Sequence, residues 1–234
     1  MTVLFDTVTG RLRLSADHWE ALLSWSQGRS SPDRQTADLR TAGVIDQGHL
    51  HTSLVPALGA ALEPVITLAV EQSDDEGVRI DGTGWVGPAG GAFLLDAPDE
   101  LRELVVVHPA MLPATLARIV ALGPRERGAT SSRRHSDAAM GALLSADTRA
   151  RRAAVNEAGG DSLSDLIDGP WNHWSIRAQW PPDGQHGLAV LDTVQQMWLI
   201  ERSAGMSLLR PTDPTEVWRL LIRILPTDDE LAVN

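Results

Sequence analysis

Few positions in this sequence combine side chains in a pattern typical of a catalytic or metal-binding site. His49 and His51 follow Asp46 closely, and imidazole and carboxylate groups are potential metal ligands. In the helix predicted over 49–62, positions two apart point to different faces, so the two histidines do not converge on one ion. We therefore interpret them as exposed residues at a helix start. The acidic run 74–76 stands beside Gly77 and is typical of a solvated turn rather than a cation site.

A glycine pattern at Gly82, Gly84 and Gly87 has the letters of a dinucleotide-binding loop. Such a loop works because a helix follows it and turns its N-terminal amide groups toward a phosphate. Here short strands are predicted around the glycines and no helix follows. We therefore interpret the three glycines as turn residues. The Gly-x-Ser-x-Gly elbow of serine hydrolases is also missing from the sequence.

The composition removes further classes of site. The 234 residues include no cysteine, and the sequence contains no lysine. This excludes disulfides, zinc–thiolate sites, iron–sulfur clusters and Schiff-base chemistry. We therefore expect no metal, no cofactor and no enzymatic activity. Twenty basic residues stand against 31 acidic ones, and the net charge of −11 argues against nucleic acid as a partner.

The distribution of apolar residues indicates the compartment. Residues 1–10 contain no long apolar run, so no secretory signal peptide is predicted there. No stretch reaches the roughly 18–20 apolar residues that a helical membrane span needs. We therefore expect a cytoplasmic protein without a membrane span.

The elements that must position any site change character along the chain. Up to residue 62, apolar residues recur mainly at helical spacing. From residue 65 the period becomes two, as in Ile66, Leu68 and Val70, which predicts strands. The sequence thus predicts one domain with five segments: a helical lead-in (1–63), a strand-rich unit (64–124), a helical insert (125–170), a second strand-rich unit (171–226) and an acidic tail (227–234).

The two strand-rich units resemble each other. Each ends in a helix bounded by prolines, and Pro109 precedes Pro124 by the same 15 residues that separate Pro211 from Pro226. A single unit of this kind leaves one sheet face and one helix stripe unburied. We therefore predict an α+β fold in which two units, related by a pseudo-twofold axis, form one central antiparallel sheet with helices packed on it.

One part of the chain resembles a known family. The run from Leu39 to Leu50, continued through Leu54, Leu58 and Leu62 to Pro64, has a small helix, a glycine, two aliphatic residues, an aspartate, a glycine turn and a leucine stripe. This pattern is similar to that of the EspG family of ESX (type VII) secretion-associated proteins of actinobacteria. The repeated strand-rich unit also looks like the internal symmetry of that family.

The resemblance implies a cytosolic chaperone, monomeric or homodimeric, that binds the apolar tip of helical-hairpin PE/PPE-like secretion substrates. In the family, a central-sheet loop and helices of the second half make this contact. By position, the loop here is 72–78 and the helices lie within 138–167. Together with one of the tryptophans, these segments supply the expected partner-binding residues: Asp74, Asp75, Glu76, Met140, Leu143, Leu144 and Trp180.

The residues themselves leave alternatives open. Trp174 and Trp180 share one strand face, where they either fill the core or line a partner-binding surface. A small-molecule-binding or enzymatic α+β protein is the second hypothesis, and it requires a deep pocket with convergent polar groups. A DNA-associated, winged-helix-like protein built on the helices of 15–62 is the third, and the net charge argues against it.

Overall fold

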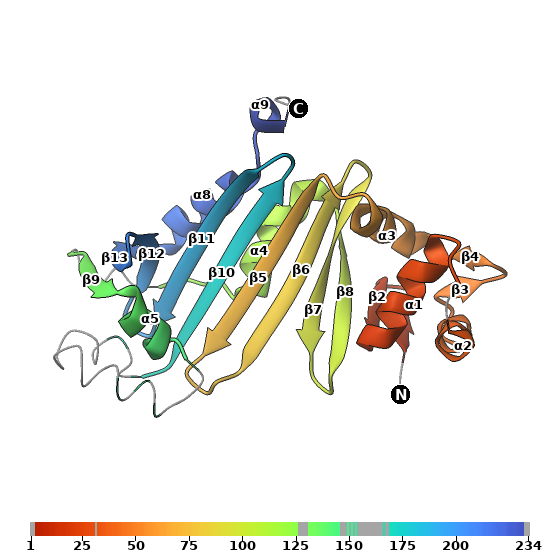
Figure 1. The fold of residues 1–234 in the computed structure, drawn as a ribbon, viewed down its shortest axis with the longest axis horizontal. Helices are drawn as coiled ribbons and strands as arrows, with labels where there is room; N and C mark the ends of the chain where they lie inside the picture. Colours follow the sequence, from red (N-terminus) through yellow and green to blue (C-terminus); the bar gives the residue numbers. More distant parts are fainter. Residues whose placement is uncertain are drawn as a thin grey trace.

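A large antiparallel sheet forms the centre of the molecule (Figure 1). The computed structural model describes residues 3–30, 32–125, 131–145, 149, 151, 153, 166 and 169–231. Within them the sheet has 11 strands, which lie in the order β1 (Leu4–Asp6), β2 (Arg11–Leu14), β8 (Leu101–Val107), β7 (Gly90–Ala97), β6 (Arg79–Gly87), β5 (Ile66–Asp74), β10 (Trp171–Trp180), β11 (Gly184–Thr193), β12 (Met197–Ser203), β13 (Met206–Thr212) and β9 (Arg133–Ser136). A separate hairpin joins β3 (Ile45–Asp46) to β4 (His49–Leu50).

The two halves of the sheet meet at its middle. β5 and β10 pair antiparallel from Thr67↔Gln179 to Asp74↔Asn172. On one side β5 to β8 follow as a meander that leads into η2 (Pro109–Met111) and α4 (Leu112–Ile119), and on the other β10 to β13 lead into α8 (Pro214–Arg223) and α9 (Asp228–Leu231). The predicted α+β class with one antiparallel sheet is confirmed. The twofold relation and the segment boundaries stay predictions.

One face of the sheet is covered by α4 and α8 (Figure 1). Alternate residues of β10 point to this face, and Trp174, Ile176 and Ala178 are buried there beside the apolar residues of β5. Leu116 of α4 and Leu221 of α8 pack onto them. The period-two pattern of the sequence thus becomes a shared core, because the same face of both central strands is apolar.

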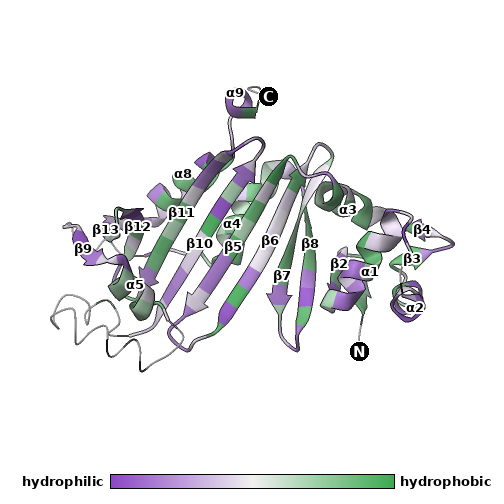
Figure 2. Ribbon diagram, viewed as in Figure 1, coloured by the Kyte–Doolittle hydropathy of each residue, from purple (hydrophilic) through white to green (hydrophobic). Residues whose placement is uncertain are grey.

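The opposite face is covered only toward its two ends. At one end α1 (Ala16–Ser26), α2 (Asp33–Thr41), η1 (Thr52–Leu54) and α3 (Val55–Leu62) form a second core with β2, β7 and β8. At the other end α5 (Asp137–Leu143) forms a third core with β10 to β13. Between them, the helices reach only the ends of the central strands: Trp19 of α1 stacks on Trp85 of β6, and α5 borders the hairpin end of β5 and β6. Figure 2 shows hydrophilic bands across β5, β6 and β10.

The N-terminal segment differs from the expected helical lead-in. It starts with the strands β1 and β2, and β2 joins the main sheet beside β8. His49 lies in β4 rather than in a helix, and His51 instead caps η1, where its Nδ1 accepts a hydrogen bond from the Ser53 amide. The strands were missed because segments of two to four residues are too short to show a period.

The three glycines expected in turns are in fact strand residues of β6. A Cβ added to Gly84 would lie 2.5 Å from the ring of Phe93, and one added to Gly82 would lie 2.5 Å from the Leu95 side chain. Both neighbours are cross-strand partners on β7. Gly82 and Gly84 are therefore explained by the space that large side chains of β7 occupy over β6, whereas a Cβ added to Gly87 would lie 3.1 Å from the backbone of Ala60 in α3.

Candidate functional site

The two segments expected to bind a partner meet at one cleft on the partly uncovered face. The cleft has a volume of about 350 Å³ and lies between the β5–β6 hairpin and the C-terminal end of α5. Residues from β5, β6, α5, β10 and β12 and from the adjoining turns line it, among them Glu71, Ser73, Arg79, Leu144, His173 and Arg202. The sheet topology creates this cleft, because β10 lies directly beside β5 and brings α5 over the end of the hairpin.

Two acidic residues hold the hairpin in its conformation. The Asp74 carboxylate accepts a hydrogen bond of 2.9 Å from the Val78 amide, across the turn at Gly77. The Asp75 amide donates to the Trp171 carbonyl at 3.2 Å, and its carboxylate accepts from the Trp171 amide at 3.4 Å. These contacts give Asp74 and Asp75 a structural role, and they leave Glu76 and Val78 at the surface, Val78 with 51% of its area exposed.

Three of the expected partner-binding residues are buried. Met140 and Leu143 are fully covered in the core beneath α5, and Trp180 keeps 7% exposure in the core under α8. Their expected direct contact with a partner is therefore corrected: amphipathic helix and strand patterns do not tell an apolar core face from an apolar interface. Leu144 is half-buried and lines the cleft. Most of 146–168, where further partner-binding helices were expected, lies outside the described residues.

His173 is a cleft residue that sequence reasoning missed. Burial, and secondarily the charge of Arg202, lower the pKa of His173 from 6.5 to about 4, so its imidazole is neutral near pH 7. Its Nε2 atom is buried and has no hydrogen-bond partner among the described residues. The sequence does place His173 on the polar side of β10, together with Ser175 and Arg177. Only the pairing of β10 with β5 shows that this side forms part of the cleft.

The charges around the cleft are unevenly compensated. Arg79 donates from its Nε to both carboxylate oxygens of Asp81, at 3.0 and 2.9 Å. These interactions with Asp81, and to a lesser extent the nearby charge of Glu71, raise the pKa of Arg79. The side chain of Arg202, in contrast, has no hydrogen bond or ion pair with another described residue. Its neighbour Glu201 is paired with Arg210 at 3.1 Å.

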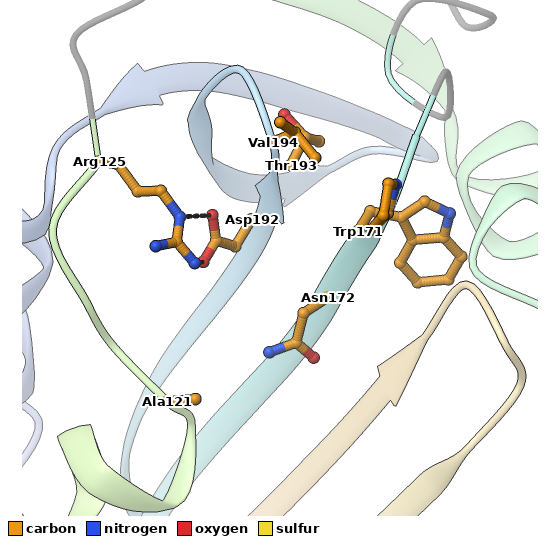
Figure 3. Close-up of a pocket in the computed structure, with 8 residues that line it drawn as sticks. Ala121, Arg125, Trp171, Asn172, Asp192, Thr193 and Val194 are labelled. Carbon is orange, nitrogen blue, oxygen red and sulfur yellow. Dashed lines mark hydrogen bonds and ion pairs between the residues drawn. The ribbon is translucent and has the colours of Figure 1, made fainter.

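A second cavity of about 490 Å³ lies where the chain leaves α4 (Figure 3). Arg125 donates two hydrogen bonds of 2.9 Å to the carboxylate of Asp192, which is 6% exposed. Burial raises the pKa of Asp192, and the hydrogen bonds and charge of Arg125 oppose that rise. Asn172 also borders the cavity. The charged groups here bind each other rather than converge on the cavity, so the pocket does not favour the small-molecule or enzymatic hypothesis.

Neither a metal centre nor a bilayer-crossing helix is found in the part of the chain that the structure describes. No three metal-ligating side chains come together there, including those around His49. None of the helices there is long and apolar enough to cross a bilayer.

Comparison with known proteins identifies the fold. Neither a protein-family model nor a curated protein matches the sequence. Among solved structures, the chain is similar to the Mycobacterium tuberculosis type VII secretion system chaperone EspG5, determined in complex with the PE25–PPE41 dimer. The superposition covers 92% of this chain and 97% of that one, with a TM-score of 0.59 and 9% identity. An identity this low speaks for the fold alone. The antiparallel sheet with its packed helices is therefore an EspG-like fold, as the sequence resemblance predicted.

Proposed function

We propose that this chain is a cytoplasmic, non-enzymatic chaperone that holds a helical-hairpin secretion substrate of the PE/PPE kind through its apolar tip. The observation that carries the proposal is the EspG-like fold over nearly the whole chain, in which the hairpin loop and α5 meet at one cleft. EspG5 is a chaperone whose structure contains a PE–PPE dimer. A helical tip that is apolar in water gains free energy when a partner covers it, and this covering prevents its self-association.

The cleft supplies suitable contacts for such a tip. Leu144 lines the cleft, and Val78 is exposed on the hairpin between Gly77 and Arg79, which both line it. The hairpin is held by hydrogen bonds of Asp74 and Asp75, so its exposed residues are already ordered before a partner binds. Because these residues are ordered before binding, association costs less conformational entropy. The proposed role needs no catalytic group, consistent with the paired charges of the second cavity.

Co-expression with a PE/PPE-type hairpin pair from the same genome tests the proposal. We expect the pair to co-purify with the chain and to become more soluble. Val78→Asp places a charge in the apolar contact and is expected to reduce the captured amount at least about tenfold, which corresponds to about 1.4 kcal/mol.

Val8→Asp is the matched control, because Val8 is 92% exposed in the β1–β2 turn, at the far end of the sheet from the cleft. This variant should capture as much substrate as the parent chain. The proposal is wrong if none of the hairpin pairs of that genome binds. It is also wrong in its choice of surface if the two aspartate variants behave alike.

A further inference from the structure

One cation that lines the cleft, Arg202, forms no side-chain hydrogen bond or ion pair with another described residue. Arg79 is engaged by Asp81, and Glu71 in turn lies within the field of Arg79. His173 is neutral near pH 7 because of its burial. Within the described part of the cleft, Arg202 is therefore the cation whose side chain has no hydrogen-bonded or ion-paired carboxylate, and Glu71 is the acidic residue that lines the same cleft. An arginine in this position keeps its guanidinium fork free for a planar, doubly accepting group.

We propose that Arg202 binds a carboxylate at the tip of the partner and so sets the position of the partner in the cleft. The inference rests on the proposed function, because it names the chemistry of the same surface. A carboxylate matches the guanidinium in both charge and geometry, whereas a partner's lysine or arginine at this point would be repelled. A second copy of this chain is not the favoured occupant, because each copy carries a net charge of −11.

Because the chain is acidic overall, a single arginine can determine where an acidic group of the partner binds. A chain with a net charge of −11 repels acidic groups over most of its surface. An acidic side chain on the apolar tip is therefore accepted only where a local cation compensates it. Apolar contacts at Val78 and Leu144 supply affinity without fixing a register, whereas a bidentate ion pair in a partly covered cleft fixes both position and orientation.

The experiment compares charge variants in binding to the PE/PPE-type pair that co-purifies with the parent chain. Arg202→Glu should weaken binding by at least about tenfold, and Arg202→Lys should weaken it less, because an ammonium keeps the charge but loses the fork. Arg219→Glu is the matched control: it makes the same charge change on an exposed residue of α8, which covers the opposite face of the sheet. Its affinity should stay within about twofold of the parent.

Two further measurements separate charge recognition from misfolding. Binding of the parent chain should weaken more steeply with salt than binding of Arg202→Glu, because one ion pair is screened. Changing one acidic residue of the partner's tip to arginine should restore binding to the Arg202→Glu variant and should not improve binding to the parent chain. If the parent binds the pair and Arg202→Glu binds equally well, the inference is overturned and the proposed function stands. If the parent binds no pair at all, both are overturned.

Discussion

Phe93 is fully buried because its partner across the sheet has no side chain. The ring lies over Gly84 of β6, at a distance that no Cβ atom could share. The same relation holds between Leu95 and Gly82. At this scale the glycines are part of the packing of the core and add nothing to ligand binding, although their letters match a nucleotide-binding loop.

Replacing Gly84 with alanine should therefore destabilise the protein. The added methyl group meets the Phe93 ring at 2.5 Å, and the ring is enclosed by the core under α4. We expect the free energy of unfolding to fall by about 1–3 kcal/mol, the usual range for overpacking a core. Urea denaturation followed by circular dichroism measures the change.

Gly59→Ala is the matched control in α3, where an added Cβ meets no atom within 4 Å. Alanine favours a helix over glycine by about 0.5–1 kcal/mol, so this variant should be as stable as the parent or more so. If Gly84→Ala were equally harmless, the packing explanation for the β6 glycines would be wrong.

At the scale of elements, the long and regular patterns could be predicted and the short or interrupted ones could not. The strand Leu101–Val107 appears within the bounds that its apolar run predicts, and Ser15 caps α1 as predicted. β6 was divided in the prediction because Gly82 and Gly84 have the composition of turns. β9 was missed because four polar residues, exposed at alternate positions, show no apolar period.

The candidate site was predictable only in part for a similar reason. The resemblance to the EspG family placed the loop at 72–78 and the helices within 138–167, and the β5–β6 hairpin and α5 both line the cleft. His173 lies on the polar side of β10, whose residues alternate with core residues, and Arg202 lies in the exposed end of β12 after four buried residues. Neither pattern indicates that the two residues share a surface. Their meeting depends on strand order, which is a long-range property that spacing along the chain does not encode.

The segment that follows α4 is tied to β11 by the ion pair between Arg125 and Asp192. The loss of stability when this pair is removed should depend on pH. Arg125→Ala leaves the buried carboxylate of Asp192 without its cation. Because Arg125 opposes the rise in the pKa of Asp192, its loss should raise that pKa further. A carboxyl group with a raised folded-state pKa contributes stability at low pH and loses it as the pH rises through that pKa.

We therefore expect Arg125→Ala to lower the free energy of unfolding by about 2 kcal/mol at pH 7 and by less near pH 4. This is below the usual cost of breaking a buried pair, because the arginine side chain is 36% exposed. Urea titrations at both pH values measure the difference. The double variant Arg125→Ala/Asp192→Asn should recover part of the loss, and an equal loss at both pH values would contradict the explanation.

Over the whole molecule, the pairing of β5 with β10 joins the two ends of the sheet. The core under α4 and α8 contains residues of both halves, including Val70 and Ile176 at the junction. A separated half would expose one of these central strands along its full edge. That the chain is one domain stays a prediction, which a folding experiment can test.

We expect one cooperative unfolding transition, with the same midpoint by far-ultraviolet circular dichroism and by tryptophan fluorescence. Leu54→Ala and Leu209→Ala remove fully buried side chains from the two end cores and should each lower stability by about 2–5 kcal/mol. Each variant should shift the whole transition as one. A variant that splits it into two steps would show that the ends unfold independently.

The outer edges of the sheet bear on how the protein avoids edge-to-edge aggregation. β1 and β9 are only three and four residues long, and they include charged residues such as Asp6, Arg133 and Arg134. A long, flat edge of unpaired amide and carbonyl groups would add extended chains as further strands. Short, charged edges limit this backbone pairing, so that an extended chain finds little edge to which it can add.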